Sequence, residues 1–290
     1  MRVCLDTRDL IDLLETRPSH LSHVDALLRT GGHRLVVSFT TVLELSAPLA
    51  HPEQSNVMRL LNQLEALPVI FVNEARIGRQ ELGAAADAFR EGREYSAVDP
   101  FVSRFDQTLD LDATPPTRSY LRYSLAETIF DLWQTAPDLW SGNSHRFPLL
   151  RERLTSDRAK ANPPTLKAHF PTVIARNLSL YGIRVPVEST APLARWIYAD
   201  PQRCAGSRLI FEVYHHIRRN EGDRGHASDL GDFAQIPILP YVDVITLDRR
   251  MRTYVGQACS SLGTDYGTIV LKGIRDLEDL LATTSDCPAA

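Results

Sequence analysis

Short apolar runs alternate with helix-like patterns at both ends of the chain, and this alternation limits the folds that the sequence can adopt. Near the amino terminus, strand-like runs cover 3–5, 35–39 and 68–72, with amphipathic helical spacing between them. Near the carboxyl terminus, runs at 241–247 and 268–271 alternate with helical patterns in the same way. Strands that alternate with helices usually pair in parallel, with helices on both faces. The sequence therefore predicts an α/β fold, a parallel-sheet α/β/α sandwich built from both ends of the chain.

The middle of the chain carries a different pattern. Between 73 and 206 the sequence has helical stretches, such as 119–133 and 165–181, separated by pieces rich in proline and glycine. Strong strand signals do not occur there. We therefore expect an α/β core formed by 1–72 and 207–290, and a large all-helical insertion at 73–206.

Composition and charge narrow the class of protein. Hydrophobic residues make up 43% of the chain and charged residues 23%, which is ordinary for a soluble globular protein. No apolar run approaches the roughly 20 residues that cross a bilayer, and charged residues interrupt the amino terminus where a signal peptide needs an apolar region. We expect a cytoplasmic protein that does not enter a membrane.

The cysteines and the net charge exclude two further classes of site. The four cysteines are scattered without a CxxC pair, so neither a disulfide framework nor a zinc site is indicated. A net charge of −4 does not suggest a basic surface over the whole protein, although a local basic groove is compatible with it. His215 and His216 are adjacent on a predicted helix and point to different faces, so we do not expect them to share a metal ion.

Carboxylates stand beside the strand-like runs. Since the carboxyl ends of parallel strands meet at one edge of a sheet, where ligands bind, these acids could converge. Carboxylate oxygens are the ligands that Mg²⁺ and Mn²⁺ prefer. The sequence therefore predicts a metal site, and the candidate catalytic and metal-binding residues are Asp6, Glu44, Asp229, Asp232 and Asp248. Asp243, within the strand-like run before Asp248, is a supporting candidate.

Each acid also has a purely structural explanation. Asp6, Asp229 and Asp248 each precede or open a predicted helix and could be its N-cap. Thr41 to Glu44 matches a capping box, in which Glu44 would reach back to a backbone amide. Several caps whose carboxylates all meet at one edge of one sheet form a less economical account than a shared site. We therefore favour the metal site.

The order of these motifs resembles the PIN domain, a family of metal-dependent ribonucleases. The resemblance rests on Leu5-Asp6-Thr7, on Ser38-Phe-Thr-Thr-Val-Leu-Glu44, on the acidic helix start at 229–232 and on Val244-Ile-Thr246-Leu-Asp248. It covers about 1–72 and 207–282 and leaves the insertion outside. It implies that Asp6, Glu44, one of Asp229 or Asp232, and Asp248 bind the metal, with Thr7 or Thr246 as a supporting hydroxyl. The chain departs from the family at Arg8, where members usually carry Asn or Ser.

The resemblance implies a metal-dependent endoribonuclease, a hydrolase in which Mg²⁺ or Mn²⁺ activates a water to attack a phosphodiester bond. RNA is the expected partner, single-stranded DNA is the alternative, and both a homodimer and a protein regulator are compatible with the family. A second hypothesis is a non-catalytic PIN-like binding module whose helical insertion is a platform for protein or RNA. Aromatic side chains of the insertion, such as Phe89, Tyr95 and Trp196, could then stack on bases, although we favour their forming the core of the insertion itself.

Overall fold

A six-stranded sheet lies at the centre of the protein. The computed structural model describes residues 1–15, 18–47, 54–109, 124–135, 166–220, 222–223 and 229–285. The strand order is β4-β3-β2-β1-β5-β6, and all neighbours pair in parallel except β3 and β4, which are antiparallel. The strands are β1 (Arg2–Cys4), β2 (Arg34–Ser38), β3 (Val69–Val72), β4 (Phe101–Val102), β5 (Val244–Thr246) and β6 (Ile269–Leu271). The fold is therefore α/β, with a mostly parallel mixed sheet.

The chain reverses its direction of travel across the sheet at β1. It moves outward from β1 to β2 and β3, and later returns to place β5 and β6 on the other side of β1. Cys4 of β1 therefore pairs with Val36 on one side and with Ile245 on the other. In open parallel sheets such a reversal leaves a crevice at the carboxyl ends of the two diverging strands, and ligands bind there. Here those strands are β1 and β5.

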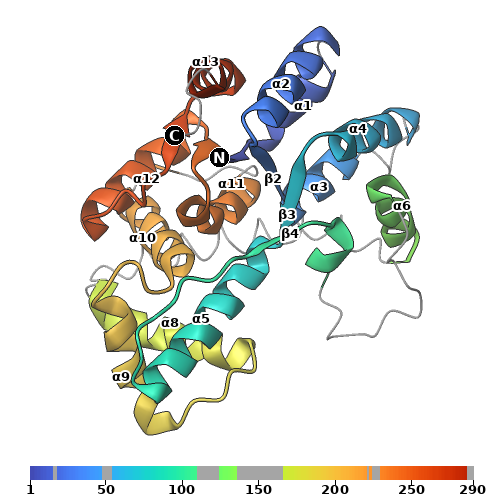
Figure 1. Ribbon diagram of the computed structural model, residues 1–290. Helices are drawn as coiled ribbons and strands as arrows, with labels where there is room; N and C mark the ends of the chain where they lie inside the picture. The colour runs from blue at the N-terminus through green and yellow to red at the C-terminus, as the bar shows by residue number, and fades with distance from the viewer. Residues whose placement is uncertain are drawn as a thin grey trace.

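Helices cover both faces of the sheet (Figure 1). Alternate strand residues point to opposite faces, so Val3 and Val37 pack into one core while Cys4, Val36 and Ile245 pack into the other. The first core is covered by α1 (Thr7–Glu15), α2 (Pro18–Thr30), α3 (Phe39–Ser46), α4 (Gln54–Ala66), α6 (Leu125–Thr135) and α13 (Ile274–Ser285). The second is covered by α10 (Ala205–Arg219), α11 (Asp229–Gln235), the 3-10 helix η3 (Ile236–Tyr241) and α12 (Arg249–Leu262).

Part of the segment 73–206 forms a helical lobe beside the sheet. Figure 1 shows α5 (Glu74–Glu91) running away from the sheet toward α8 (Leu166–Leu180) and α9 (Val187–Tyr198). These three helices bury a core of their own, which includes Leu82, Phe170, Leu193 and Ile197. The rings of Phe89 and Trp196 contact each other in that lobe, tilted by 58° and with centroids 5.7 Å apart, so they are packing residues there.

The expectation that 73–206 is entirely helical is wrong at β4. Phe101 and Val102 pair with Val72 and Phe71 of β3 and extend the sheet at that edge. A two-residue strand is too short to show the alternation by which strands are recognised in a sequence. The neighbouring 3-10 helix η2 (Phe105–Thr108) also packs against this edge, where the Phe105 ring contacts Phe71.

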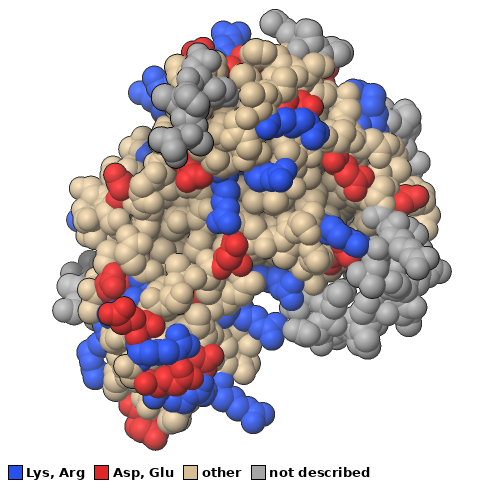
Figure 2. All heavy atoms as spheres, viewed as in Figure 1, with Lys and Arg blue, Asp and Glu red and all other residues tan. Residues whose placement is uncertain are grey.

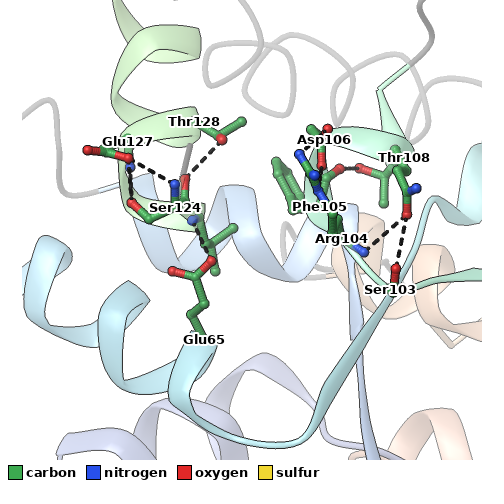
Figure 3. Close-up of polar contacts among 11 residues, drawn as sticks. Glu65, Ser103, Arg104, Phe105, Asp106, Thr108, Ser124, Glu127 and Thr128 are labelled. Atoms are coloured by element: carbon green, nitrogen blue, oxygen red, sulfur yellow. Dashed lines mark hydrogen bonds and ion pairs between the residues drawn. The ribbon is translucent and has the colours of Figure 1, made fainter. Parts of the chain in front are cut away.

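The helix α6 also belongs to the core rather than to the lobe. Figure 3 shows Glu65, at the end of α4, accepting the Leu125 backbone N–H at 2.9 Å. The same close-up shows a capping box, in which the Ser124 backbone N–H donates to Glu127 and the Glu127 N–H donates back to the Ser124 hydroxyl. A helix of the expected insertion is therefore fixed to the first face of the sheet. No helix in the described ranges is both long and apolar enough to cross a membrane.

Candidate functional site

Asp6 and Thr246 join the carboxyl ends of β1 and β5. The Asp6 backbone N–H donates to the Thr246 hydroxyl at 2.8 Å, beyond the point where the two strands pair through their main chains. The Thr246 side chain is fully buried. A buried backbone N–H without a partner would be destabilising, so this hydroxyl completes the strand end and fixes where the Asp6 side chain starts.

Asp9 lies on the same threonine. The Thr246 hydroxyl, which accepts from Asp6, and the backbone N–H of Ile274 at the start of α13 both lower the pKa of Asp9, so both lie near its carboxylate. Gly273 approaches so closely that a Cβ there would lie 3.3 Å from an Asp9 carboxylate oxygen. Asp9 therefore lies beside the end of β5 and the turn that follows β6.

Asp248 follows β5 and caps α12. Its side chain accepts the Met251 backbone N–H at 2.6 Å, with the extended backbone typical of an N-cap. The predicted capping role of Asp248 is thus confirmed. A carboxylate has several acceptor positions, and the side chain is exposed, so capping does not exclude a ligand.

Glu44 reaches the site through Thr7. The Thr7 hydroxyl donates to a Glu44 carboxylate oxygen. The helix that carries Glu44 is capped elsewhere, because α3 begins at Phe39 and the Ser38 hydroxyl accepts the Thr41 N–H at 2.9 Å. The capping box predicted for Thr41 and Glu44 is therefore wrong, and the Glu44 carboxylate points to the start of α1 instead.

The remaining predicted acids are placed differently. Asp229 opens α11, and Asp232 is half-buried one turn later in the same helix. Asp243 lies at the amino end of β5, where its carboxylate accepts the Arg2 backbone N–H at 2.6 Å. Asp243 and Asp248 therefore lie at opposite ends of β5, and the supporting role predicted for Asp243 does not fit this site.

A pocket of about 500 Å³ opens at the carboxyl ends of β1, β5 and β6. Asp6, Asp9 and Asp248 line it together, and Glu44, Asp232 and Asp243 do not. Among the described residues, the lining is Asp6, Arg8, Asp9, Ile11, Asp12, Glu15, Leu247, Asp248 and Lys272. The structure therefore brings together two of the predicted acids, Asp6 and Asp248, and adds Asp9 to them.

Burial and mutual repulsion disfavour the charged forms of these acids. Burial raises the pKa of Asp6, and the negative charges of Asp9 and Asp248 raise it further. Burial likewise raises the pKa of Asp9, and hydrogen bonding from Thr246 opposes the shift. The pKa of Glu44 is raised by burial and by Asp6, and lowered by the Thr7 hydroxyl. A cation in the pocket would relieve this repulsion.

The donor set suits a hard divalent cation, with one restriction. Carboxylate and hydroxyl oxygens are the ligands such cations take, and Mg²⁺ is commonly held by only one or two carboxylates, with waters and substrate phosphates as the other ligands. Across the described ranges, no three His, Cys, Asp or Glu side chains are grouped closely enough to hold one ion. Two carboxylates per ion is therefore the arrangement that this site fits.

Two acids escaped the sequence analysis. Asp9 follows Asp6 by three residues, and one turn of the predicted helix brings it back to the side of Asp6, a spacing that could have pointed to it. Glu74 is buried at the start of α5, and its carboxylate accepts the backbone N–H groups of Phe39 and Thr40 at 3.1 and 2.9 Å. Glu74 thus fixes the first turn of α3, the helix that carries Glu44. No local sequence pattern predicts this contact.

Neither the charge pattern on the surface nor comparison with known proteins assigns a function to this site. On the face drawn in Figure 2, Lys and Arg side chains are interspersed with Asp and Glu rather than gathered in one basic patch. No family model, curated protein or solved structure matches this chain.

Proposed function

We propose that this protein is a metal-dependent nuclease that hydrolyses phosphodiester bonds, with RNA as its substrate. One observation carries the proposal: Asp6, Asp9 and Asp248 line a single pocket at the carboxyl ends of β1 and β5, where the chain reverses its direction across the sheet. Ligands bind at this place in open parallel sheets, and clustered carboxylates are suited to divalent cations. The same arrangement supports the assignment to a PIN-like fold that the motifs suggest.

Mg²⁺ or Mn²⁺, when bound, would supply an activated water and stabilise charge on the leaving oxygen. Asp6 and Asp248 would hold the ion, since each presents a carboxylate to the pocket from a different strand. The Thr246 hydroxyl positions Asp6 by accepting the Asp6 backbone N–H, and it also interacts with the carboxylate of Asp9. Glu44 would position the site indirectly, because it accepts a hydrogen bond from Thr7, the residue next to Asp6.

Cleavage of end-labelled RNA by matched variants tests the proposal. We expect wild type to cleave with Mn²⁺ or Mg²⁺ but not with chelator, and Asp6→Asn and Asp248→Asn to lose at least 100-fold, within the roughly 10²- to 10⁴-fold range of single catalytic groups. Asp243→Asn is the control, because it makes the same change at the other end of β5. Equal activity in all four proteins would contradict the proposal.

A non-catalytic binding module is the second candidate. The absence of a three-carboxylate group in the described ranges favours it. The packing of the lobe argues against an aromatic RNA platform, because Phe170 contacts both Tyr198 and Phe211 in the interior. A binding module would retain its affinity for a partner when Asp6 is neutralised, whereas a nuclease would lose cleavage.

A further inference from the structure

Two basic side chains line the acidic pocket, and both are available to a ligand. Arg8 lies in the first turn of α1 and Lys272 directly follows β6, and both are exposed. Within the described ranges, neither forms an ion pair within 4.0 Å. Other surface arginines do, for example Arg29 with Asp25 and Arg90 with Asp87. Arg8 and Lys272 therefore present to the pocket positive charge that is not engaged in a close ion pair.

Helix stability does not explain Arg8. The amino end of a helix carries partial positive charge, so a cation in the first turn is unfavourable there by a few tenths of a kcal/mol. Its charge does attract the neighbouring Asp9 and lowers the pKa of that carboxyl. Arg8 could thus serve only to offset the acids, or it could also contact a ligand, and these two roles predict different measurements.

The strand order separates the two cations. Arg8 follows β1, Asp248 follows β5 and Lys272 follows β6, and these three strands are consecutive in the sheet. Neighbouring strands lie about 4.8 Å apart, so β1 and β6 are separated by roughly 10 Å at this edge. The two basic residues therefore follow strands on either side of β5, whose carboxyl end carries Asp248.

We propose that Arg8 and Lys272 bind two different phosphates of one nucleic-acid strand, one on each side of the phosphodiester that faces Asp6 and Asp248. This inference rests on the proposed nuclease function and adds the residues that position the substrate. A strand that spans both cations needs phosphates flanking the reacting one. A mononucleotide would therefore engage only one of the two side chains.

The lining also indicates how the strand is recognised. Among the residues that the structure describes, no aromatic side chain lines the pocket, and the apolar lining consists of Ile11 and Leu247. Base stacking on aromatic rings is the usual source of base contacts in single-strand binding. The pocket instead offers charge to the backbone, which carries no sequence information. Binding there is therefore expected to depend little on base composition.

The salt dependence of binding tests this inference without metal or cleavage. Affinity for a short fluorescent oligouridine and for an oligoadenosine of equal length is measured in chelator between roughly 50 and 200 mM salt. For single strands, each phosphate contact contributes about 0.7 to the slope of log affinity against log salt. We expect Arg8→Gln and Lys272→Gln each to reduce the slope by about 0.7 for both oligonucleotides, and the double variant by about 1.4.

Arg275→Gln is the matched control, since Arg275 is exposed in the first turn of α13 but does not line the pocket. It should leave the slope unchanged. An unchanged slope in Arg8→Gln and Lys272→Gln would overturn the inference, whether or not their thermal stability changes. If wild type cleaves RNA with Mn²⁺ while those slopes stay unchanged, the nuclease proposal stands and only this inference fails. If wild type neither binds nor cleaves, both fail.

Discussion

At the scale of single residues, the site is a group of acids held by hydrogen-bond donors that carry no full charge. The Asp6 carboxylate is stabilised by the backbone N–H groups of Thr7 and Arg8, Asp9 by Thr246 and Ile274, and Glu44 by Thr7. These donors do not offset burial, because the pKa of each acid remains raised. The ionised site therefore destabilises the folded protein at neutral pH.

Neutralising Asp6 should stabilise the metal-free protein in a pH-dependent way. Its pKa in the folded protein lies above the ordinary value of 3.8, so ionisation penalises the folded state above that raised pKa. We expect Asp6→Asn to raise the free energy of unfolding at pH 7 by a few tenths to about 1 kcal/mol, since solvent screens part of the repulsion. The gain should shrink as the pH falls through the raised pKa toward 3.8.

Urea unfolding at several pH values in chelator measures this difference. Asp243→Asn serves as the comparison, because that carboxylate is exposed at the other edge of the sheet. A gain for Asp6→Asn that stayed the same from pH 7 down to the acid range would show that the charge of Asp6 is not its source.

At the scale of secondary-structure elements, local sequence patterns predicted the features that depend on residues close together in the chain. The strands at the two ends of the chain and the helix after each of them follow from apolar runs and their spacing, and so does the convergence of Asp6 and Asp248. The position of Asp9 depends on Thr246 and Ile274, more than 200 residues away, and Glu74 depends on the turn at Phe39 and Thr40. Such contacts leave no periodic trace in the sequence.

The junction of α5, α10 and η3 shows the same dependence on distant partners. Glu81 of α5 is fully buried and accepts the backbone N–H groups of Gly206 and Ser207 at 2.6 and 2.9 Å, so it caps α10 from another helix. A Cβ at Gly206 would lie 2.5 Å from the Pro237 carbonyl oxygen. Only glycine therefore lets these three elements meet.

Two glycine-to-alanine changes should have opposite effects on stability. We expect Gly206→Ala to lower the free energy of unfolding by about 1–3 kcal/mol, because the backbone of η3 must move. Gly83→Ala, in the middle of α5 with no atom within 4 Å of the added Cβ, should raise it by about 0.5–1 kcal/mol. Urea unfolding of both variants measures the contrast, and a Gly206→Ala variant as stable as wild type would contradict the close approach at Gly206.

At the scale of the whole molecule, one buried arginine joins the helical lobe to the core. Arg208 of α10 is 3% exposed, and its guanidinium carbon lies 4.1 Å from the ring centre of Tyr198 in α9 and 4.8 Å from that of Phe170 in α8. Its Nε and Nη1 have no hydrogen-bond partner, while the buried Glu212 lies one turn along α10 and lowers the cost of its charge. Cation–π contacts thus hold the lobe where an ordinary ion pair is missing.

Arg208 and Glu212 should therefore be coupled energetically. We expect Arg208→Met to lower the free energy of unfolding by about 3 kcal/mol, because it removes two cation–π contacts and the positive charge that favours the ionised form of the buried Glu212. Adding Glu212→Leu should recover most of that loss, since a matched apolar pair needs no charge compensation. A double-mutant cycle by urea unfolding measures the coupling, and strictly additive losses would contradict it.

The hydrogen bond between Asp6 and Thr246 joins residues that are 240 positions apart in the chain. Ribosomes add about 5–20 residues per second, so Asp6 emerges roughly 10–50 seconds before its partner strand exists. During that time the nascent chain carries one half of the pocket and cannot close it. Under the proposed function, the messenger that encodes this protein is therefore translated almost to its end before the site can act on any RNA.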